Sequence, residues 1–360
     1  MKINELVDIS CKNSDKFLSK DEMKFYTDYI NSLMGNSKRY KTYCLLGARG
    51  VGKSYALSKK LCVQKAKYGD MCKAYWIRIS DTSTKALLRN HAQDFIDPDL
   101  QRRYDLELST KGPVIFNHGK EFCRCIALAG SGKFKGQAVY DKDFVKNGGR
   151  YFIVLDEMNL EITERKTFDI ATAFVSVLET LIRKEFDGVT LFLVGNTAAD
   201  ANVILSKLFN FQPEPGKFGR YKIPGKSLIV DYQAPSEAYM KMHAKSLIGH
   251  MNVSDDASYS NQQIISTELI YKGRVNKPST IIRFSRYKKD WFTLWDGKIV
   301  KKYNEETIKS YIAMRPYLNG FYSVDRAKEI INIFDAQGFL FDNLATQAYF
   351  ADELSKIRTK

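Results

Sequence analysis

The sequence predicts an α/β fold with a central parallel sheet, followed by a smaller α+β domain. From residue 41 onward, short apolar segments alternate with helical ones, an order typical of a parallel sheet with helices on both faces. The alternation ends at 210–236, where prolines and glycines indicate a boundary. A chain of 360 residues is long enough to form a core on each side of that boundary.

Hydrophobic periodicity predicts the elements of the first part. Apolar runs predict strands at 43–46, 74–79, 114–116, 122–128, 151–155 and 189–194. Periodic segments between them predict helices at 55–68, 83–95, 163–184 and 198–209. The predicted organisation is an N-terminal helical extension at 1–36, an α/β domain at 37–209, a linker at 210–236 and a C-terminal domain at 237–360.

A glycine-rich segment joins the first predicted strand to the first predicted helix. Residues 47–54 have the pattern G-x-x-x-x-G-K-[ST], in which backbone N–H groups face the phosphates of a nucleotide. Lys53 would reach the β- and γ-phosphates, and the Ser54 hydroxyl would bind Mg²⁺. The sequence therefore predicts a loop for ATP and Mg²⁺, formed by Gly47, Ala48, Arg49, Gly50, Val51, Gly52, Lys53, Ser54 and Tyr55.

Two carboxylates, Asp156 and Glu157, follow the apolar strand at 151–155. We expect Asp156 to hold Mg²⁺ through water and Glu157 to polarise the attacking water as general base. A solvated acidic strand end is the alternative, which the fully apolar strand disfavours. The pair is typical of the additional-strand, catalytic-glutamate (ASCE) class of P-loop ATPases, so 37–209 is predicted to be such a domain. The additional strand, which separates the two nucleotide-binding strands, is expected within 106–128.

Further groups are needed at the γ-phosphate. Asn196 follows the next apolar strand, where it could contact the phosphate or hold the water; capping the following helix is an equal alternative. Phosphoryl transfer also needs positive charge, often from an arginine of another subunit. The first candidate is Arg183, at the end of a predicted helix, and the alternatives are Arg49, Arg78 and Lys85.

The composition points to a polyanionic partner. The formal net charge is +15, which favours nucleic acid over a membrane surface or simple solubility. The six cysteines show no zinc-binding spacing and are expected to be reduced core residues of a cytosolic protein. The N-terminus lacks the apolar segment of a signal peptide, and no apolar stretch is long enough for a transmembrane helix.

Together these motifs resemble the terminase-like DNA-packaging ATPases of small short-tailed bacteriophages with protein-primed genomes (Picovirinae-type). The resemblance covers about residues 40–200. Its motifs are the phosphate loop with Arg49 inside it, the aromatic–hydrophobic–arginine strand at 75–78, the Leu-Asp-Glu at 155–157 and the helix that ends at Arg183. It implies that Arg183 is an arginine finger acting in trans. A second trans-acting basic residue would fall between Arg78 and Lys85, with Lys85 the suspected one.

The resemblance also implies partners and location. It implies a homo-oligomeric, pentameric ring that moves double-stranded DNA into a preformed capsid. Such a ring docks on the portal through a packaging RNA. It would therefore lie in the host cytoplasm and transiently on the portal vertex.

A loop at 130–150, rich in glycine and lysine, precedes the Asp156-Glu157 strand. Its start at 129–136 resembles a glycine-serine-basic stretch of larger phage terminases. A ring motor must contact DNA phosphates without reading bases, which suits lysine, and a loop that leads into this strand could move with nucleotide state. The alternative is a solvated loop. The predicted DNA contacts are Lys133, Lys135, Lys142 and Lys146.

For the C-terminal domain the resemblance implies an RNase H-like nuclease fold. A live nuclease of this type needs several carboxylates around two metals. Residues 283–302 instead carry seven basic residues against Asp290 and Asp296, with Trp291 and Trp295 between them. We therefore expect a vestigial nuclease domain that contacts nucleic acid or the portal, although a solvated basic strand pair explains the same residues. Asp296-Gly297 predicts a hairpin turn within it.

Two other functions stay open at this point. One is a P-loop helicase or partition-type ATPase that acts on nucleic acid. The other is a nucleotide-gated DNA-binding scaffold, in which ATP only switches the conformation. A P-loop kinase is disfavoured by the Asp156-Glu157 pair and by the charge of +15.

Overall fold

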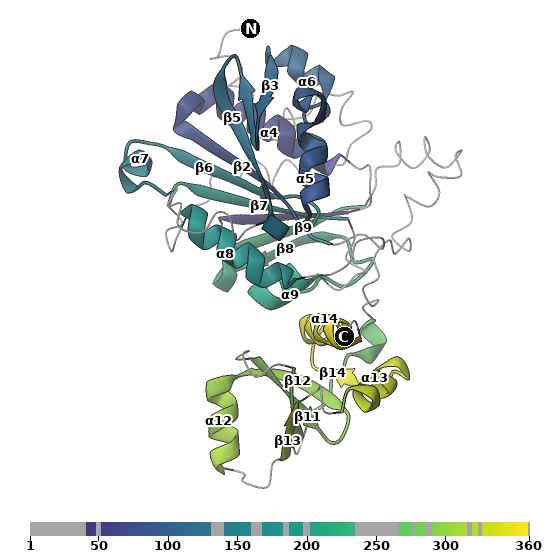
Figure 1. Ribbon diagram of the computed structural model, residues 1–360. Coiled ribbons are helices and arrows are strands. Elements are labelled where there is room, and N and C mark those ends of the chain that lie inside the picture. The colour runs from purple at the N-terminus through teal and green to yellow at the C-terminus, as the bar shows by residue number, and fades with distance from the viewer. Residues whose placement is uncertain are drawn as a thin grey trace, which may run out of the picture. The chain divides into compact units, whose positions relative to one another are not determined.

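The computed structural model describes most of the chain as two compact units (Figure 1). The described residues are 41–47, 52–130, 140–159, 168–182, 187–196, 202–234, 266–275, 278–284, 290–314, 319–322 and 326–358. The expected extension at 1–36 and the residues at 235–265 lie outside these ranges. The first unit comprises Met1–Leu160, Glu164–Thr197 and Lys217–Ala257, and the second comprises Glu161–Thr163, Ala198–Gly216 and Ser258–Lys360.

The first unit is organised on a nine-stranded sheet in the order β3-β4-β5-β2-β6-β7-β1-β9-β8. The strands from β5 to β9 in that order run parallel, and antiparallel pairs extend both edges. This confirms the α/β fold with a central parallel sheet. The strands are β1 (Thr42–Leu46), β2 (Cys72–Arg78), β3 (Leu108–Lys111), β4 (Val114–Asn117), β5 (Lys120–Ala127), β6 (Arg150–Leu155), β7 (Val189–Gly195), β8 (Gly219–Ile223) and β9 (Leu228–Tyr232).

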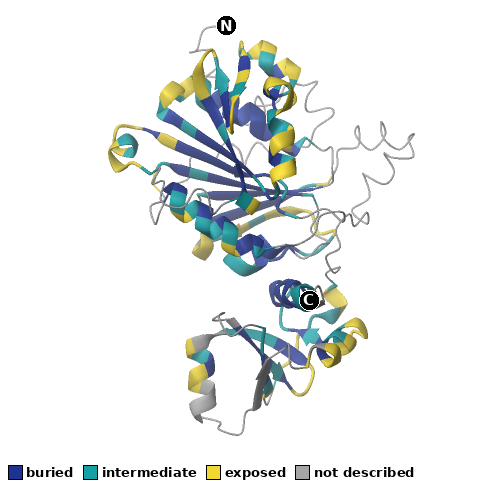
Figure 2. Ribbon diagram, in the orientation of Figure 1, coloured by how far each residue is buried: buried dark blue, intermediate teal, exposed yellow. Residues whose placement is uncertain are grey.

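The central strands are buried along almost their whole length, as Figure 2 shows in dark blue. Burial on both faces explains why they are continuous apolar runs in the sequence. Leu57 and Leu61 of α4 pack in one core cluster with Trp76 of β2 and Val154 of β6, while α8 lies across a face of the sheet (Figure 1). The helices of this unit are α4 (Lys53–Tyr68), α5 (Asp81–Leu88), α6 (Pro98–Arg103), α7 (Lys142–Lys146) and α8 (Ile170–Ile182).

The strand that separates β1 from β6 is β7, which pairs with both. The expectation that it falls within 106–128 was wrong, because those residues form β3, β4 and β5 on the far side of β2. The two hairpins β3–β4 and β4–β5 form by local antiparallel pairing, so they extend the sheet at its edge.

The predicted linker at 210–236 was also wrong in part. It contains β8 and β9, and β9 is buried and pairs with β1 in parallel. The prolines and glycine at 213–216 lie where the chain passes from the second unit back to the first, between Gly216 and Lys217, so this part of the linker coincides with a unit boundary. Conversely, α9 (Val203–Phe209), predicted inside the ATPase domain, belongs to the second unit.

The helix predicted at 83–95 ends early. After α5, the residues Asn90, His91 and Ala92 have φ of 49°, 55° and 62°, in the left-handed region that helices cannot continue through. The turn places Ala92, Phe95 and Ile96 in the core of the unit, and their burial offsets the backbone strain.

Five of the six cysteines lie among the described residues, all in the first unit, and they are buried and free. Burial raises the pKa of Cys62 to about 12 and that of Cys72 to about 11. A thiol so far from ionisation is a poor nucleophile and a poor metal ligand. The expectation of reduced core cysteines is confirmed for these five, namely Cys44, Cys62, Cys72, Cys123 and Cys125, while Cys11 lies outside the described residues.

The second unit is an α+β unit on a five-stranded sheet in the order β13-β10-β11-β12-β14. Asp296 and Gly297 close the β11–β12 hairpin with φ of 47° and 78°, so the predicted turn is confirmed. An RNase H-like topology stays a prediction. Its further elements are β10 (Pro278–Arg283), β11 (Asp290–Trp295), β12 (Ile299–Asn304), β13 (Asn319–Tyr322), β14 (Leu340–Phe341), α12 (Glu305–Met314), α13 (Ala327–Asp335) and α14 (Leu344–Arg358).

A buried ion cluster joins α9 to α14 in this unit. Lys207 Nζ lies 2.7 Å from Asp352 Oδ2 and 2.8 Å from Glu353 Oε1, and Lys356 pairs with the same two carboxylates. The side chains of Lys207, Asp352 and Glu353 are at most 7% exposed. Removing one member of such a cluster leaves buried charge without full compensation.

We expect Lys207→Met to lower the free energy of unfolding of the second unit by about 3 kcal/mol, because two buried carboxylates then lose one of the two lysines that pair with them. Urea unfolding followed by tryptophan fluorescence measures this, since Trp291 and Trp295 are buried in the second unit. Lys328→Met on the exposed surface of α13 is the matched control. Equal stability of the two variants would show that the cluster is neutral.

Candidate nucleotide-binding site

The carboxyl ends of β1, β2, β6 and β7 meet at one edge of the first sheet. Leu46 pairs with Gly195, Leu155 with Leu193, and Ile77 with Leu155, so these strands end at similar levels. In open parallel sheets this edge is where ligands bind. The phosphate loop after β1, Asp156-Glu157 after β6 and Asn196 after β7 are thus brought to the same edge.

The two ends of the glycine-rich segment at 47–54 are described, at Gly47 and at residues 52–54. Gly52 has a φ of 90° and precedes α4, which begins at Lys53 without a side-chain cap on its first N–H groups. Lys53 is buried, and its Nζ donates to the Gly47 carbonyl at 2.7 Å, so it reaches back across the loop. Ser54 and Tyr55 follow in the first turn of α4, where Ser54 is exposed. Residues 48–51, with Arg49, lie outside the described residues.

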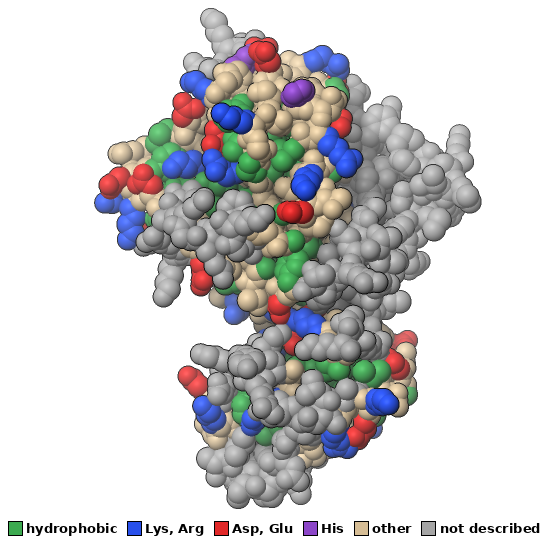
Figure 3. Space-filling view, viewed as in Figure 1, with side chains coloured by type: hydrophobic (Ala, Val, Ile, Leu, Met, Phe, Trp, Pro, Cys, Tyr) green, Lys and Arg blue, Asp and Glu red, His purple; other side chains and the backbone are tan. Residues whose placement is uncertain are grey.

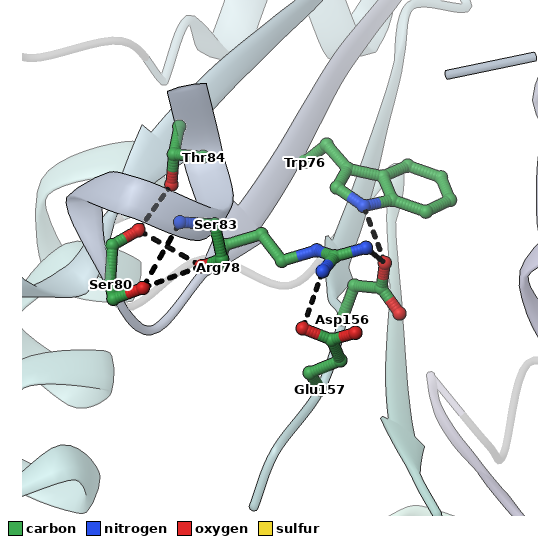
Figure 4. Close-up of polar contacts among 7 residues, drawn as sticks. All are labelled: Trp76, Arg78, Ser80, Ser83, Thr84, Asp156 and Glu157. Carbon is green, nitrogen blue, oxygen red and sulfur yellow. Dashed lines mark hydrogen bonds and ion pairs between the residues drawn. The ribbon is translucent and has the colours of Figure 1, made fainter. Parts of the chain in front are cut away.

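Asp156 and Glu157 share one arginine (Figure 4). Arg78 Nη2 donates to Asp156 Oδ2 at 2.6 Å, and Arg78 Nη1 pairs with Glu157 Oε2. Burial lowers the pKa of Arg78, but the two carboxylates raise it to a net value above the usual one, so the guanidinium stays charged. Because Arg78 forms ion pairs with two carboxylates of its own chain, it is a poor candidate for the trans-acting charge.

Glu157 has an unusual backbone conformation for its residue type, with a φ of 61°. The residues on either side fix the turn, because Asp156 N donates to Ile77 O at 2.9 Å and Met158 N donates to Val194 O at 2.8 Å. A left-handed residue of this kind costs about 1 kcal/mol and persists only where its neighbours determine it. The turn leaves the Glu157 side chain 35% exposed beside the almost fully buried Asp156.

Asp156 and Ser54 fit a magnesium ion. Trp76 and Arg78 both bond to Asp156 Oδ2, whereas Oδ1 accepts no hydrogen bond from the described part of the chain. Mg²⁺ takes oxygen ligands and is typically held by one or two protein groups together with phosphates and water. Asp156 Oδ1 and the exposed Ser54 hydroxyl supply such groups, and no larger cluster of metal-binding side chains occurs among the described residues.

Asn196 is half-buried directly after β7. The alternative that it caps the next helix was wrong for α9, because the cap is Asn202, whose side chain accepts from Leu205 N at 2.9 Å. Asn196 therefore remains the proposed γ-phosphate contact.

The other candidate basic residues differ in placement. Lys85 is exposed in the last turn of α5, a helix that begins directly after β2 and is capped by Ser80 (Figure 4). Arg183 follows the last described residue of α8 and lies outside the described residues. The trans-acting roles of both stay predictions.

The expected DNA-contacting loop is only partly described, since Lys133 and Lys135 lie outside the described residues. Lys142 and Lys146 belong to α7, so the expectation of a loop was wrong at these positions. The ring of Phe144 packs edge-on against the ring of Tyr151, with centroids 5.4 Å apart. A Cβ on Gly149 would lie 2.5 Å from Phe144, so α7 packs closely against the start of β6.

The position of α7 also separates it from the candidate active site. It precedes β6, at the end opposite to Asp156, about 20 Å away along a six-residue strand. On the face seen in Figure 3, Lys and Arg side chains of this unit alternate with acidic ones. DNA binding by Lys142 and Lys146 stays a prediction.

Trp76 is the site residue that sequence reasoning missed. Its Nε1 donates to Asp156 Oδ2 at 3.0 Å. The available signal was its position two residues before Arg78, which places both side chains on one face of β2. It could be used only once β2 was known to lie beside β6.

Two solved structures share this architecture. The gp11 DNA packaging motor of Phi-28 aligns with a TM-score of 0.62 and 15% identity over 88% of this chain and 95% of that one. A chain of the bacteriophage Phi-29 viral genome packaging motor assembly aligns with a TM-score of 0.58 and 16% identity over 93% of this chain and 100% of that one. This chain has the fold of a phage DNA-packaging motor protein.

At such identities the likeness concerns the fold. No protein-family model matches the sequence, and neither does any curated protein. No helix in the described ranges is long and apolar enough to cross a membrane.

Proposed function

We propose that this chain is a Mg²⁺-dependent ATPase that drives double-stranded viral DNA into a preformed capsid. The observation that carries the proposal is the phosphate loop after β1 opposite Asp156-Glu157 after β6, with β7 between them. This is the arrangement of the catalytic-glutamate ATPases. It occurs here on a fold shared with two DNA-packaging motor proteins.

Each residue at the edge has a role in hydrolysis. Lys53 and the loop N–H groups would hold the phosphates, and Ser54 and Asp156 would hold Mg²⁺, which would supply positive charge to the phosphate oxygens. Glu157 accepts a proton from the attacking water. The water oxygen then bonds to the γ-phosphorus as the bond to the β-phosphate oxygen breaks. Asn196 positions that water or the γ-phosphate.

Arg78 must release Glu157 before this step, because a carboxylate held by a guanidinium is a weak base. Through its two ion pairs, Arg78 still keeps two neighbouring carboxylates in place, and one of these carboxylates is buried. We expect Arg78→Ala to lower ATP turnover by about 10- to 100-fold, the usual effect of losing a group that orients catalytic or metal-binding side chains. Steady-state phosphate release measures it, and Arg124→Ala, an arginine on the next strand β5, is the control. Unchanged turnover would show that Arg78 does not organise the site.

The assembly is part of the proposal. A homo-oligomeric, pentameric ring would let Arg183 of one subunit complete the site of its neighbour. The ring would encircle DNA through Lys133, Lys135, Lys142 and Lys146 and would dock on the portal through a packaging RNA, in the host cytoplasm. The second unit would be a vestigial RNase H-like domain without nuclease activity, and its basic strands would contact nucleic acid or the portal.

The ATPase rate against added duplex DNA tests the proposal. Protein–phosphate contacts release counterions, so we expect DNA to stimulate turnover and the stimulation to fall steeply between about 50 mM and 200 mM salt. Slow turnover that DNA does not raise would contradict the proposal and favour a nucleotide-gated scaffold. ATP-dependent strand separation would favour a helicase.

A further inference from the structure

We propose that Trp76 is a positioning residue that orients the metal-binding carboxylate of Asp156. This inference rests on the proposed function, because it concerns the same Mg²⁺ site. Its basis is the hydrogen bond from Trp76 Nε1 to Asp156 Oδ2, at 3.0 Å between two residues that are each 1% exposed (Figure 4). A buried hydrogen bond to a charged acceptor is among the stronger ones in a protein.

The indole is held rigidly. Phe95 packs edge-on against it with ring centroids 4.9 Å apart and an interplanar angle of 89°. Trp76 is also part of the core cluster beneath α4, and its strand is paired with β6 through Ile77 and Leu155. The N–H donor is thus fixed relative to the end of β6, where Asp156 begins.

The hydrogen bond decides which oxygen of Asp156 is available to the metal. An indole N–H only donates, so it binds Oδ2 and directs that oxygen toward β2. Oδ1 accepts no hydrogen bond among the described residues, so it is the oxygen left to bind a metal ion. A metal-binding carboxylate held in this way binds its ion more tightly than one free to rotate.

Trp76 and Arg78 contact the same oxygen with different consequences. The Arg78 guanidinium is a cation and opposes a divalent ion at the same carboxylate. The indole is neutral, so it orients Asp156 without cancelling the charge that attracts Mg²⁺. Trp76 is therefore suited to hold the carboxylate through the whole nucleotide cycle, including any step in which Arg78 moves away.

Trp76→Phe tests the role, because it keeps an aromatic ring against Phe95 and removes the N–H. The readout is Mn²⁺ affinity in the ADP complex, measured by electron paramagnetic resonance, together with ADP affinity in EDTA. We expect Mn²⁺ to bind about 10- to 100-fold more weakly while ADP affinity in EDTA is unchanged. Purely structural damage would weaken ADP binding in EDTA as well and would overturn the proposal.

Trp295→Phe is the matched control, since Trp295 Nε1 also donates a buried hydrogen bond, to Thr293 Oγ1 at 2.8 Å in the second unit. It should leave Mn²⁺ affinity unchanged. Mn²⁺ affinity in Trp76→Phe equal to that of the wild type would overturn the proposal and leave the ATPase function standing. If the ADP affinity of the wild-type protein did not change when Mn²⁺ is added, both this proposal and the proposed ATPase function would be overturned.

A measurement on the unaltered protein covers the case in which Trp76→Phe does not fold. The chain has three tryptophans, so its ¹H–¹⁵N spectrum should contain three indole signals. The Trp76 signal should shift when Mg²⁺ is added to the ADP complex, and those of Trp291 and Trp295 should not. If the chemical shift of the Trp76 indole signal did not change when Mg²⁺ is added, the proposal would be overturned.

Discussion

Glu157→Gln is expected to bind ATP with wild-type affinity and to hydrolyse it about 10²- to 10⁴-fold more slowly, the contribution of a general base. Glutamine keeps the size of the side chain and an oxygen that can still accept from Arg78, but it cannot take a proton from water. The left-handed turn at Glu157 is also preserved, because the neighbouring backbone hydrogen bonds fix it. The variant should therefore trap ATP in an intact site.

Single-turnover hydrolysis with excess protein measures the chemical step, and filter binding measures the trapped ATP. Glu121→Gln on β5 is the matched control, because its partly exposed carboxylate pairs with Arg124 rather than with groups of the site. A Glu157→Gln rate within about twofold of the wild type would mean that another group is the base.

Arg183→Ala is expected to leave ATP binding intact and to lower turnover by roughly three to five orders of magnitude, as for other arginine fingers. A guanidinium that stabilises charge only in the transition state contributes little to ground-state binding. Arg102→Ala is the control variant, because Arg102 is exposed and its ion pair among the described residues is with the neighbouring Asp99.

Mixing subunits separates action in trans from action in cis. Lys53→Ala subunits bind no nucleotide but retain Arg183, whereas Arg183→Ala subunits retain the phosphate loop. If the finger acts in trans, mixed rings regain activity where an Arg183→Ala site faces a Lys53→Ala neighbour. A mixture as inactive as either variant alone would contradict a trans-acting Arg183.

The strands could be predicted, but their order could not. The apolar runs at 43–46 and 151–155 form most of β1 and β6, as expected. Which strand separates them depends on pairings between residues far apart in the chain, such as Tyr43 with Phe192. The segment at 106–128 was therefore assigned a place that β7 occupies.

Turn residues predicted the hairpin between adjacent strands, but they did not show that strands of the first sheet follow the prolines. Asp296-Gly297 closes a hairpin between adjacent strands, so its residues alone predict the turn. The prolines at 213–215 lie where the chain passes between the two units, but they do not reveal β8, the edge strand that carries Arg220. This arginine pairs with the buried Asp231 at 2.6 Å across to β9. No local pattern reveals that pairing.

The residues of the candidate site also fall into two groups: those that local motifs predict and those that depend on which strands are neighbours. Lys53, Ser54, Asp156 and Glu157 lie in contiguous motifs whose chemistry requires those residue types, so they could be predicted. Trp76 and Arg78 belong to the site only because β2 lies beside β6. Their contacts to Asp156 join residues nearly eighty positions apart.

Displacement of a third strand from a DNA triplex tests most directly whether this site drives movement along duplex DNA. The chain is expected to displace the third strand in ATP and Mg²⁺, and to fail with a non-hydrolysable analogue or with Glu157→Gln. A third strand that stays bound while the wild-type protein consumes ATP on the same DNA would contradict the proposed motor.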